Sequence, residues 1–572
     1  MTGFTATQLQ VMWNRLLAIV EEQGQALIRT AFSPIVRECG DISAGIFDLR
    51  GRMLAQAVTG TPGHINTMAE AVKTLRDHFA LQEMKPGDIY VTNDPWIASG
   101  HLNDFLLLMP VFRKGHIVGF TSCTSHLADV GGLGMGPEGA DIYDEGLLVP
   151  PCKLVDHGEV NGLLLDIIKA NSREPIANEG DIYALISCCE TGAMRLVEMM
   201  DEFGLEHLDP LAEHIIETSR RGTLAAIAEV PTGIYHNTLR TDGYESEIEL
   251  RAQLTITSDS VAVDFSGTSD CSQKGINVPL NYATAYTVFA LRCIIGPDIP
   301  NNAGSLAPFK VTGPAGCILN ARPPAPVAMR HTLGQMTPDL VFGCLHQATP
   351  ESIPAEGASC MYDLPLRSAP EVARHGGRVF AVELTHSGGT GARPTKDGLS
   401  ATGFPSGVWG SQVEITESVA PVLITKRELR RDSGGPGRWR GGLGQHIELQ
   451  SANDQSFLVF LSVERIKFPA RGRDGGGAGA PGRIRLDDGP PLSGKGEITV
   501  CPGETLIFET PGGGGIGDPK SRGRDLVRRD LAEDLIDPEA ARMIYGLEVG
   551  EDGPGSDPPA MWRPWNPMSW PI

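Results

Sequence analysis

The sequence lacks the long apolar run that a membrane-spanning helix needs. Its longest apolar stretches, Leu16 to Val20 and Phe105 to Pro110, fall far short of the roughly 20 residues that cross a bilayer. At the N-terminus no charged leader precedes an apolar core, because Arg15, Glu21 and Glu22 interrupt the first apolar pattern. We therefore expect no membrane span, no signal peptide and a cytoplasmic protein.

Positive charge is also scarce. The chain has 48 Lys and Arg residues against 70 Asp and Glu residues, a formal net charge of −22, and a pI near 5.1. Nucleic acids and anionic membranes bind positively charged protein surfaces, so neither is an expected partner of this acidic chain.

The 11 cysteines include no C-x-x-C pair. Neither a zinc knuckle nor a disulfide framework is indicated, and we interpret these cysteines as reduced core residues.

Familiar nucleotide and hydrolase motifs are missing as well. Gly489 to Gly496 matches a P-loop except that Gly496 replaces the final Ser or Thr. A P-loop follows a strand and opens a helix, whereas two prolines lie inside this segment and the strand-like Glu497 to Phe508 follows it. The sequence contains no G-x-S-x-G elbow, no H-E-x-x-H and no Rossmann fingerprint in a strand-to-helix context.

Glycine and proline are in excess. The 69 Gly and 42 Pro residues make up about 19% of the 572 residues, against an ordinary value of roughly 12%. With 41% hydrophobic residues the chain is still globular, and its length suits several domains. We interpret the glycine-rich runs 434–444 and 511–517 as tight turns.

The apolar periodicity predicts an α+β, multidomain, mixed and β-rich fold with N-terminal helices and a glycine-rich β C-terminal region. Helices are expected over 7–31, opened by a Thr7/Gln10 capping box, and over about 66–80. The predicted domains are an N-terminal α/β metal-binding domain (1–230), a central α+β domain (231–365), a C-terminal glycine-rich β domain (366–548) and a Pro/Trp-rich tail (549–572). The tail holds Trp562, Trp565 and Trp570, and either folds back on its own domain or docks on a partner.

The stretches Ser99 to Asp104 and Ser125 to Asp129 are the most informative. If 104–112 and 116–125 form a hairpin that turns near Lys114, Asp104 faces Thr124 and Leu102 faces His126. His101, Asp104 and His126 then share one end, where cross-strand Cβ atoms lie about 5 Å apart. Two imidazoles and a carboxylate suit Mn, Fe or Zn. The alternative is a pair of ordinary histidines and an Asp cap.

A Gly-rich acidic loop follows the second strand. Such loops are usually solvated, but next to a metal one can supply a base or hold a ligand through hydrogen bonds. Its acidic residues are Asp129, Glu138, Asp141, Asp144 and Glu145. Upstream, the polar groups of Arg37 to Asp41 and of Gly63-His64 lie at element ends, where caps and turn residues are the simpler interpretation.

Several segments together resemble the hydantoinase B/oxoprolinase family, the B-type subunit of ATP-dependent hydantoin and lactam hydrolases, which is related to the alpha subunit of acetone carboxylase. The matching runs occur in the family's order from residue 37 to residue 519. They are Arg37 to Asp48, Thr92 to Pro95, His101 to Asp104, Ser125 to Gly132, Asp144 to Gly146, Asp264 to Thr268, Ile299 to Gly304, Leu429 to Gly444 and Thr510 to Pro519.

The resemblance implies a division of labour. An A-type partner of actin-like kinase fold binds ATP and phosphorylates the carbonyl oxygen of a small cyclic amide, and the B-type chain completes the reaction. It also implies a hetero-oligomer, such as a dimer of heterodimers. A subunit of an ATP-dependent ketone carboxylase, or a non-catalytic scaffold, are the alternatives.

Site residues follow from the same resemblance. The metal ligands fall on His101, Asp104 and His126, and the ion is a divalent transition metal (Mn, Zn or Fe). The remaining residues implied are Glu38 and Asp41 of an E-x-x-D segment, His64, and Asp129, with Asp129 or Glu38 as general base. Two departures bear on the substrate and not on the metal: Ser125 stands where a second histidine is common, and Gly63 to Asn66 replaces His-Leu-Gly.

Overall fold

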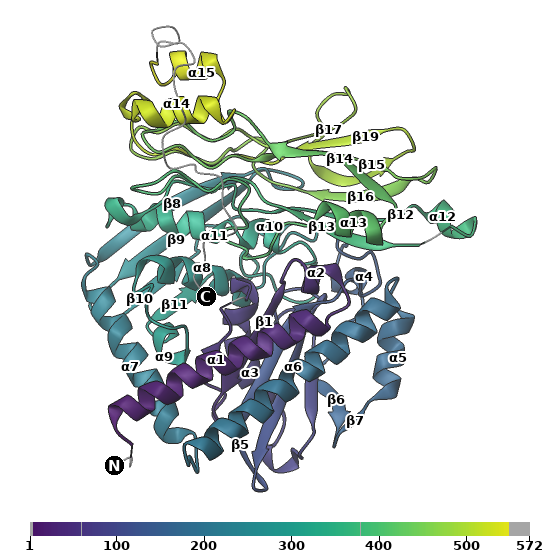
Figure 1. Cartoon of the computed structure of the whole chain (residues 1–572), viewed down its shortest axis with the longest axis vertical. Helices are drawn as coiled ribbons and strands as arrows, with labels where there is room; N and C mark the ends of the chain where they lie inside the picture. Colours follow the sequence, from purple (N-terminus) through teal and green to yellow (C-terminus); the bar gives the residue numbers. More distant parts are fainter. Residues whose placement is uncertain (1–3, 59, 378, 548–572) are drawn as a thin grey trace, which may run out of the picture.

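The structure is a computed structural model that describes residues 4–58, 60–377 and 379–547. Figure 1 shows an N-terminal α/β part below, a central part with its own sheet, and C-terminal sheets topped by two short helices. The fold is α+β, multidomain and β-rich, as the sequence predicts. The Pro/Trp-rich tail of 549–572 lies outside the described residues, and the domain boundaries stay predictions.

The N-terminal part is built on a seven-stranded sheet. Its strand order is β2-β1-β5-β4-β3-β6-β7. Helices α1 (Ala6–Thr30) and α6 (Pro175–Glu202) cover one face, and α3 (Pro62–His78) covers the other. Leu107 of β4 lies in the core between the sheet and helices α1 and α6, and Leu108 lies in the core between the sheet and α3, so the strand is apolar on both faces. The strands are β1 (Ile42–Phe47), β2 (Met53–Gln56), β3 (Ile89–Thr92), β4 (Asp104–Arg113), β5 (His116–His126), β6 (Cys152–Asp156) and β7 (Glu159–Val160).

Two helix starts differ from the sequence prediction. The capping box of α1 is formed by Thr5 and Gln8, not by Thr7 and Gln10: the Gln8 N–H donates to Thr5 Oγ1, and the Thr5 N–H donates to Gln8 Oε1. Helix α3 begins at Pro62, four residues earlier than predicted, because proline already has a helical φ and needs no partner for a backbone N–H at the first position. The earlier start places His64 in the first turn of α3.

The hairpin of β4 and β5 forms with a register two residues away from the predicted one. Lys114 (φ 51°) and Gly115 (φ 82°) make the two-residue turn, and a bulge lies between Val111 and Phe112. Asp104 is therefore directly opposite His126, and not opposite Thr124. The pairing predicted between Leu102 and His126 was wrong by two residues. The turn is centred between Lys114 and Gly115, which moves the register by one residue, and the bulge moves it by one more.

The central part contains a second sheet and several helices. Helix α8 (Leu280–Ile294) packs on α3 and on α11 (Thr337–Leu345), and the Asn281 side chain donates to the carbonyl of Ala98 at 2.8 Å. These contacts tie the central part to the loop that precedes β4. The sheet order is β11-β10-β9-β8. The strands are β8 (Gly233–Thr241), β9 (Ile248–Ile256), β10 (Val261–Asp264) and β11 (Phe309–Thr312).

Two four-stranded sheets, in the orders β13-β12-β16-β18 and β14-β15-β19-β17, share one apolar core in the C-terminal part. The single strand expected over 497–508 is instead two strands in different sheets, because the chain turns at Gly503 (φ 87°). The strands are β12 (Tyr362–Ser368), β13 (Ala381–His386), β14 (Val422–Leu429), β15 (Gln445–Ser451), β16 (Phe457–Ser462), β17 (Arg483–Leu486), β18 (Lys495–Val500) and β19 (Thr505–Glu509).

The glycine-rich runs pack backbone against backbone and are not simply tight turns. The N–H of Gly513 donates to Gly442 O, and the N–H of Gly442 donates to Thr390 O. A Cβ on Gly389 would lie 1.9 Å from Gly442 O, and one on Gly512 would lie 1.8 Å from Ser433 O. Glycine is required here because no side chain fits between the segments.

The remaining elements are short, except for α7. None of the helices in the described residues is long and apolar enough to cross a membrane. They are α2 (Pro34–Arg37), α4 (Ile142–Glu145), α5 (Gly162–Ala170), α7 (Asp209–Ala228), α9 (Ala303–Leu306), α10 (His331–Gly334), α12 (Pro370–Arg374), α13 (Val413–Val419), α14 (Arg524–Ala532), α15 (Pro538–Met543) and the 3₁₀ turns Leu81–Glu83, Pro350–Ser352 and Pro519–Ser521.

Candidate metal and catalytic site

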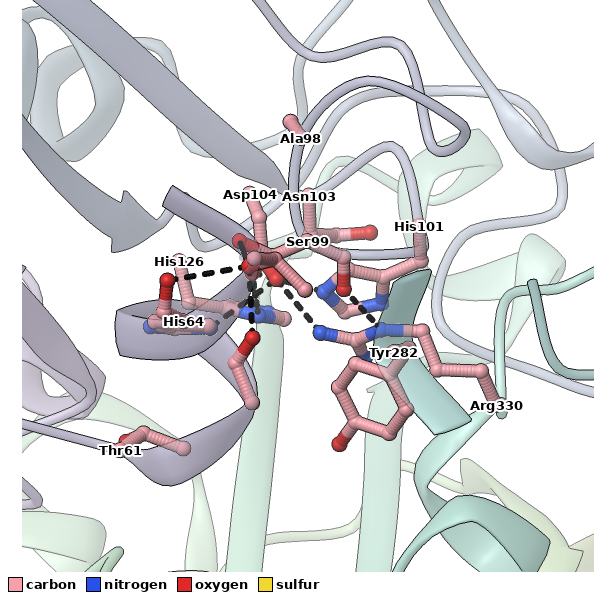
Figure 2. A network of polar contacts seen from close by, with 12 residues as sticks. Thr61, His64, Ala98, Ser99, His101, Asn103, Asp104, His126, Tyr282 and Arg330 are labelled. Carbon is pink, nitrogen blue, oxygen red and sulfur yellow. Dashed lines mark hydrogen bonds and ion pairs between the residues drawn. The ribbon is translucent and has the colours of Figure 1, made fainter. Parts of the chain in front are cut away.

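Three predicted ligands meet at the ends of β4 and β5. Ligand atoms of His101, Asp104 and His126 lie within 4.8 Å of one another, and all three residues are buried. Asp104 Oδ1 is 2.7 Å from His101 Nε2 and 3.3 Å from His126 Nδ1. Figure 2 shows the two imidazoles and the carboxylate converging.

The loop before β4 sets the orientation of His101. Gly100 has φ 89°, and a Cβ there would lie 2.7 Å from Arg330 Cδ, so glycine is needed both for the turn and for the close approach. His101 Nδ1 lies 3.1 Å from Ala328 O, and since a carbonyl only accepts, Nδ1 carries the proton. Burial, reinforced by the positive Arg330, lowers the pKa of His101 to about 4. Its Nε2 lies 2.7 Å from Asp104 Oδ1, so the ring faces two acceptors, and a cation bound at Nε2 would satisfy this contact while Nδ1 keeps its proton.

Arg330 is the fixed cation of the site. Its Nη2 donates to Asp104 Oδ2 at 2.5 Å, its Nε donates to Ser99 O at 2.5 Å, and its guanidinium lies 4.2 Å from the centre of the Tyr282 ring. Figure 2 shows this guanidinium between the tyrosine and the carboxylate. Burial alone would raise the pKa of Asp104, but His101, His64 and Arg330 together hold it well below its ordinary value. Asp104 is therefore a carboxylate at neutral pH.

A second histidine-carboxylate pair adjoins the first. His64 Nε2 lies 3.0 Å from Asp104 Oδ2, and its Nδ1 lies 3.5 Å from Asp41 Oδ1. Thr61 Oγ1 donates to that Asp41 oxygen at 2.8 Å, and Asp41 Oδ2 is 4.0 Å from His126 Nδ1. Burial disfavours the charged imidazole, but the charges of Asp104 and Asp41 outweigh it and raise the pKa of His64.

Sequence reasoning missed three residues on the opposite wall. Glu383 Oε2 lies 3.0 Å from His126 Nε2, and His331 Nε2 lies 3.5 Å from Asp363 Oδ2. Burial and the charge of Glu383 hold the pKa of Asp363 well above its usual range, whereas burial is outweighed at Glu383 by His126, which lowers its pKa. A signal was present: Asp363 and Glu383 are each followed directly by a leucine in a strand-like segment.

The structure does not bring Glu38 and Asp129 into this cluster. Glu38 pairs with Arg37 at 2.7 Å, and it does not line the cavity that contains Asp41 and His64. Asp129 Oδ1 is 2.7 Å from Arg173 Nη1, in a neighbouring cavity.

The acidic loop contributes a buried carboxyl that supports His101 indirectly. Glu145 Oε1 accepts hydrogen bonds from the backbone N–H groups of Val327 at 2.6 Å and Ala328 at 2.8 Å. The carbonyl of the same Ala328 accepts from His101 Nδ1. Burial, countered in part by those two N–H groups, raises the pKa of Glu145 to about 8. The other acids of the loop serve as caps and partners: Asp141 caps α4, and Glu138 pairs with Lys274.

The family model for hydantoinase B/oxoprolinase matches residues 5–519. The chain belongs to this family. The B-type subunit of a putative D-/L-hydantoinase from a Pseudomonas species is 28% identical over 95% of each chain. The crystal structure of the ATP-dependent caprolactamase from Pseudomonas jessenii superposes with a TM-score of 0.86, at 27% identity, over 97% of this chain and 98% of that one. A nucleotide-free acetone carboxylase shares the fold, with a TM-score of 0.83 at 19% identity, over 94% of this chain and 79% of that one.

The donor set fits the divalent metal that the family resemblance implies. His101 would offer Nε2, and Asp104 would offer a carboxylate oxygen. Burial would lower the pKa of His126, but Glu383 and Asp104 raise it to about 10, so His126 must give up a proton when it completes a set of two nitrogens and one oxygen. Such a set suits Mn, Zn or Fe with positions left for water or substrate. Within the described residues, His64 Nδ1 is a buried nitrogen with no hydrogen-bond partner, so polar binding capacity remains inside the cavity.

Proposed function

We propose that this member of the hydantoinase B/oxoprolinase family is the metal-containing B-type subunit of an ATP-dependent cyclic-amide hydrolase. It opens a hydantoin, 5-oxoproline or lactam ring after an A-type partner has phosphorylated the substrate. The observation that carries the proposal is the buried cluster of His101, Asp104 and His126, in a chain similar to the B-type subunit of a putative hydantoinase and to an ATP-dependent caprolactamase.

Phosphorylation answers the chemical difficulty of the reaction. An amide carbonyl is a poor electrophile, and a phosphoryl group on its oxygen gives an imidate-like phosphate whose carbon accepts hydroxide. Collapse of the tetrahedral carbon then breaks the C–N bond of the ring, the nitrogen takes a proton, and the acyl phosphate that remains is hydrolysed to a carboxylate and inorganic phosphate. A divalent ion held by His101, Asp104 and His126 would lower the pKa of a bound water and supply hydroxide at neutral pH.

The chain's own residues then have distinct tasks. Arg330 keeps Asp104 ionised, and the Ala328 carbonyl keeps the Nε2 of His101 available. We assign proton acceptance to Asp41, and not to Glu38 or Asp129, because Asp41 lines the cavity beside His126 while the other two are paired with arginines elsewhere.

ATP belongs to the partner in this proposal. The P-loop-like segment of 489–496 leads into β18, and no helix begins there. A phosphate-binding turn needs the N-terminus of a helix behind it, so this segment supports no nucleotide site. The chain's similarity to relatives that are themselves B-type or beta subunits fits a separate ATP-binding partner.

The test is reconstitution of the chain with its A-type partner, followed by a screen of hydantoin, 5-oxoproline and caprolactam with ATP, with and without bicarbonate. We expect bicarbonate-independent ring opening that needs both chains, and about one transition metal per B-type chain. A His101→Ala, Asp104→Ala double variant should lose metal and activity, whereas His116→Ala, at the exposed hairpin turn, should keep both. Full metal occupancy in the double variant would contradict the metal site, and ATP turnover that depends on bicarbonate would favour a ketone carboxylase.

A further inference from the structure

The strand pair β12–β13 presents a polar face to the candidate site. Its register places Pro365 opposite Glu383 and Arg367 opposite Ala381. Because side chains alternate along a strand, Asp363, Arg367 and Glu383 share one face. The opposite face, with Leu364, Leu366 and Leu384, is buried in the C-terminal core.

A second cavity lies between this face and the N-terminal part. Met135 and Glu383 line both this cavity and the one that holds the metal cluster, so the two compartments are neighbours. On the metal side, Glu383 contacts His126. The second compartment is also lined by Asp129, Leu133, Arg173, Arg367 and Phe460.

The two arginines of this cavity are not equally neutralised. Arg173 makes a close ion pair with Asp129 at 2.7 Å and donates to Gly132 O at 2.5 Å. Arg367 instead donates to Leu133 O at 3.2 Å and makes a long contact of 3.5 Å with Glu497.

The Arg367 guanidinium is held in place by an aromatic ring. It lies 4.5 Å from the centre of the Phe460 ring. Burial, with the positive Arg173 nearby, lowers the pKa of Arg367. The result is a pre-positioned, partly buried cation with spare hydrogen-bonding capacity beside another cation. A planar fork of this kind binds carboxylate or phosphate through two hydrogen bonds.

We propose that Arg367 binds an anionic oxygen group of the substrate in this second cavity, while the reacting carbonyl lies beyond Glu383 at the metal cluster. This inference rests on the proposed function and adds a specificity-determining residue to it. The group is a carboxylate or a phosphoryl, since both offer the same pair of oxygens to a guanidinium. The former belongs to the substrate itself, as in 5-oxoproline, and the latter is the group that the partner transfers.

The experiment has one binding arm and one kinetic arm. In the binding arm, titration of the purified chain with inorganic phosphate should show a dissociation constant at least tenfold higher for Arg367→Gln than for the parent. Arg367→Lys should have an intermediate dissociation constant, because lysine keeps the positive charge but lacks the two parallel N–H donors of the guanidinium. Arg483→Gln, at an exposed arginine on β17, is the matched control and should bind as the parent does.

In the kinetic arm, the reconstituted complex is assayed with 5-oxoproline and with caprolactam, which has no carboxylate. If Arg367 binds the substrate carboxylate, Arg367→Gln should raise KM about tenfold for 5-oxoproline and leave KM for caprolactam unchanged. If Arg367 binds the phosphoryl group, the same variant should lower kcat for both substrates. Unchanged phosphate binding together with unchanged KM and kcat for both substrates would overturn the inference. Arg367-dependent phosphate binding in a complex that opens no ring would leave the inference standing and overturn the proposed function instead.

Discussion

The ion pair between Asp104 and Arg330 allows a quantitative test of how the site is held together. The two side chains are 0% and 4% exposed, and the pair is closed by a 2.5 Å hydrogen bond. Asp104→Asn keeps the shape and removes the charge, which leaves the Arg330 guanidinium buried without its counter-charge.

The expected loss follows from that burial. Removing one partner of a buried ion pair costs about 3–5 kcal/mol of unfolding free energy, because the other charge is left uncompensated. Arg330→Gln also loses the bond to Ser99 and the contact with Tyr282, so it destabilises as well. In the double variant neither partner is left as an unpaired buried charge. Its loss of unfolding free energy should therefore be smaller than the sum of the two single losses by about 0.5–3 kcal/mol.

Urea unfolding of the metal-free chain in EDTA, followed by circular dichroism, measures the cycle without a contribution from metal binding. The control is Asp156→Asn, because Asp156 is 66% exposed in its pair with Lys153 and its loss should cost less than about 1 kcal/mol. If Asp104→Asn is no more destabilising than this control, or if the two site variants are strictly additive, the account of Arg330 as the charge that keeps Asp104 ionised is wrong.

Four further predictions concern the glycine packing, Glu145 and ATP. Gly389→Ala should destabilise the chain by at least about 1–3 kcal/mol in thermal unfolding, because its Cβ would meet a carbonyl oxygen at 1.9 Å, whereas Gly162→Ala, at an open helical position, should be neutral or stabilising. Glu145→Ala should weaken metal binding at least about tenfold by isothermal titration, whereas Glu145→Gln keeps an acceptor for Val327 and Ala328 and should bind almost as the parent does. Burial raises the pKa of Glu145 from 4.5 to about 8, so the folded state binds the Glu145 proton more tightly than the unfolded state does. The free energy of unfolding that this group contributes should therefore fall as the pH rises from about 4.5 to about 8. Glu145→Gln should not show this pH dependence. The isolated chain should show no ATPase activity in a phosphate-release assay, and robust turnover would refute the division of labour.

Local patterning was enough to predict the hairpin and the group at its end. His101, Asp104 and His126 flank two apolar segments, and a turn near Lys114 brings the ends of these segments together. The family motifs added His64 and Asp41, which the structure places in contact with the cluster. The mismatch between 489–496 and a true P-loop could also be recognised from the sequence, because it depends only on the residues within and next to this segment.

The register and the opposite wall were decided by tertiary structure. The exact position of the turn and a one-residue bulge between Val111 and Phe112 together set which residue faces His126, and a bulge is stabilised by the surrounding sheet and not by its own residue types.

Arg330, Glu383 and Arg367 reach the site from segments far along the chain. Periodicity reports which face of an element is buried, but not which distant element covers it. Those placements depend on how the C-terminal sheets and the helices of the central part pack on the N-terminal part, and on the glycine segments whose bare backbones allow the C-terminal strands to approach one another. The sequence therefore determined the chemistry available at the end of one hairpin, and the packing of distant segments decided which charges surround it.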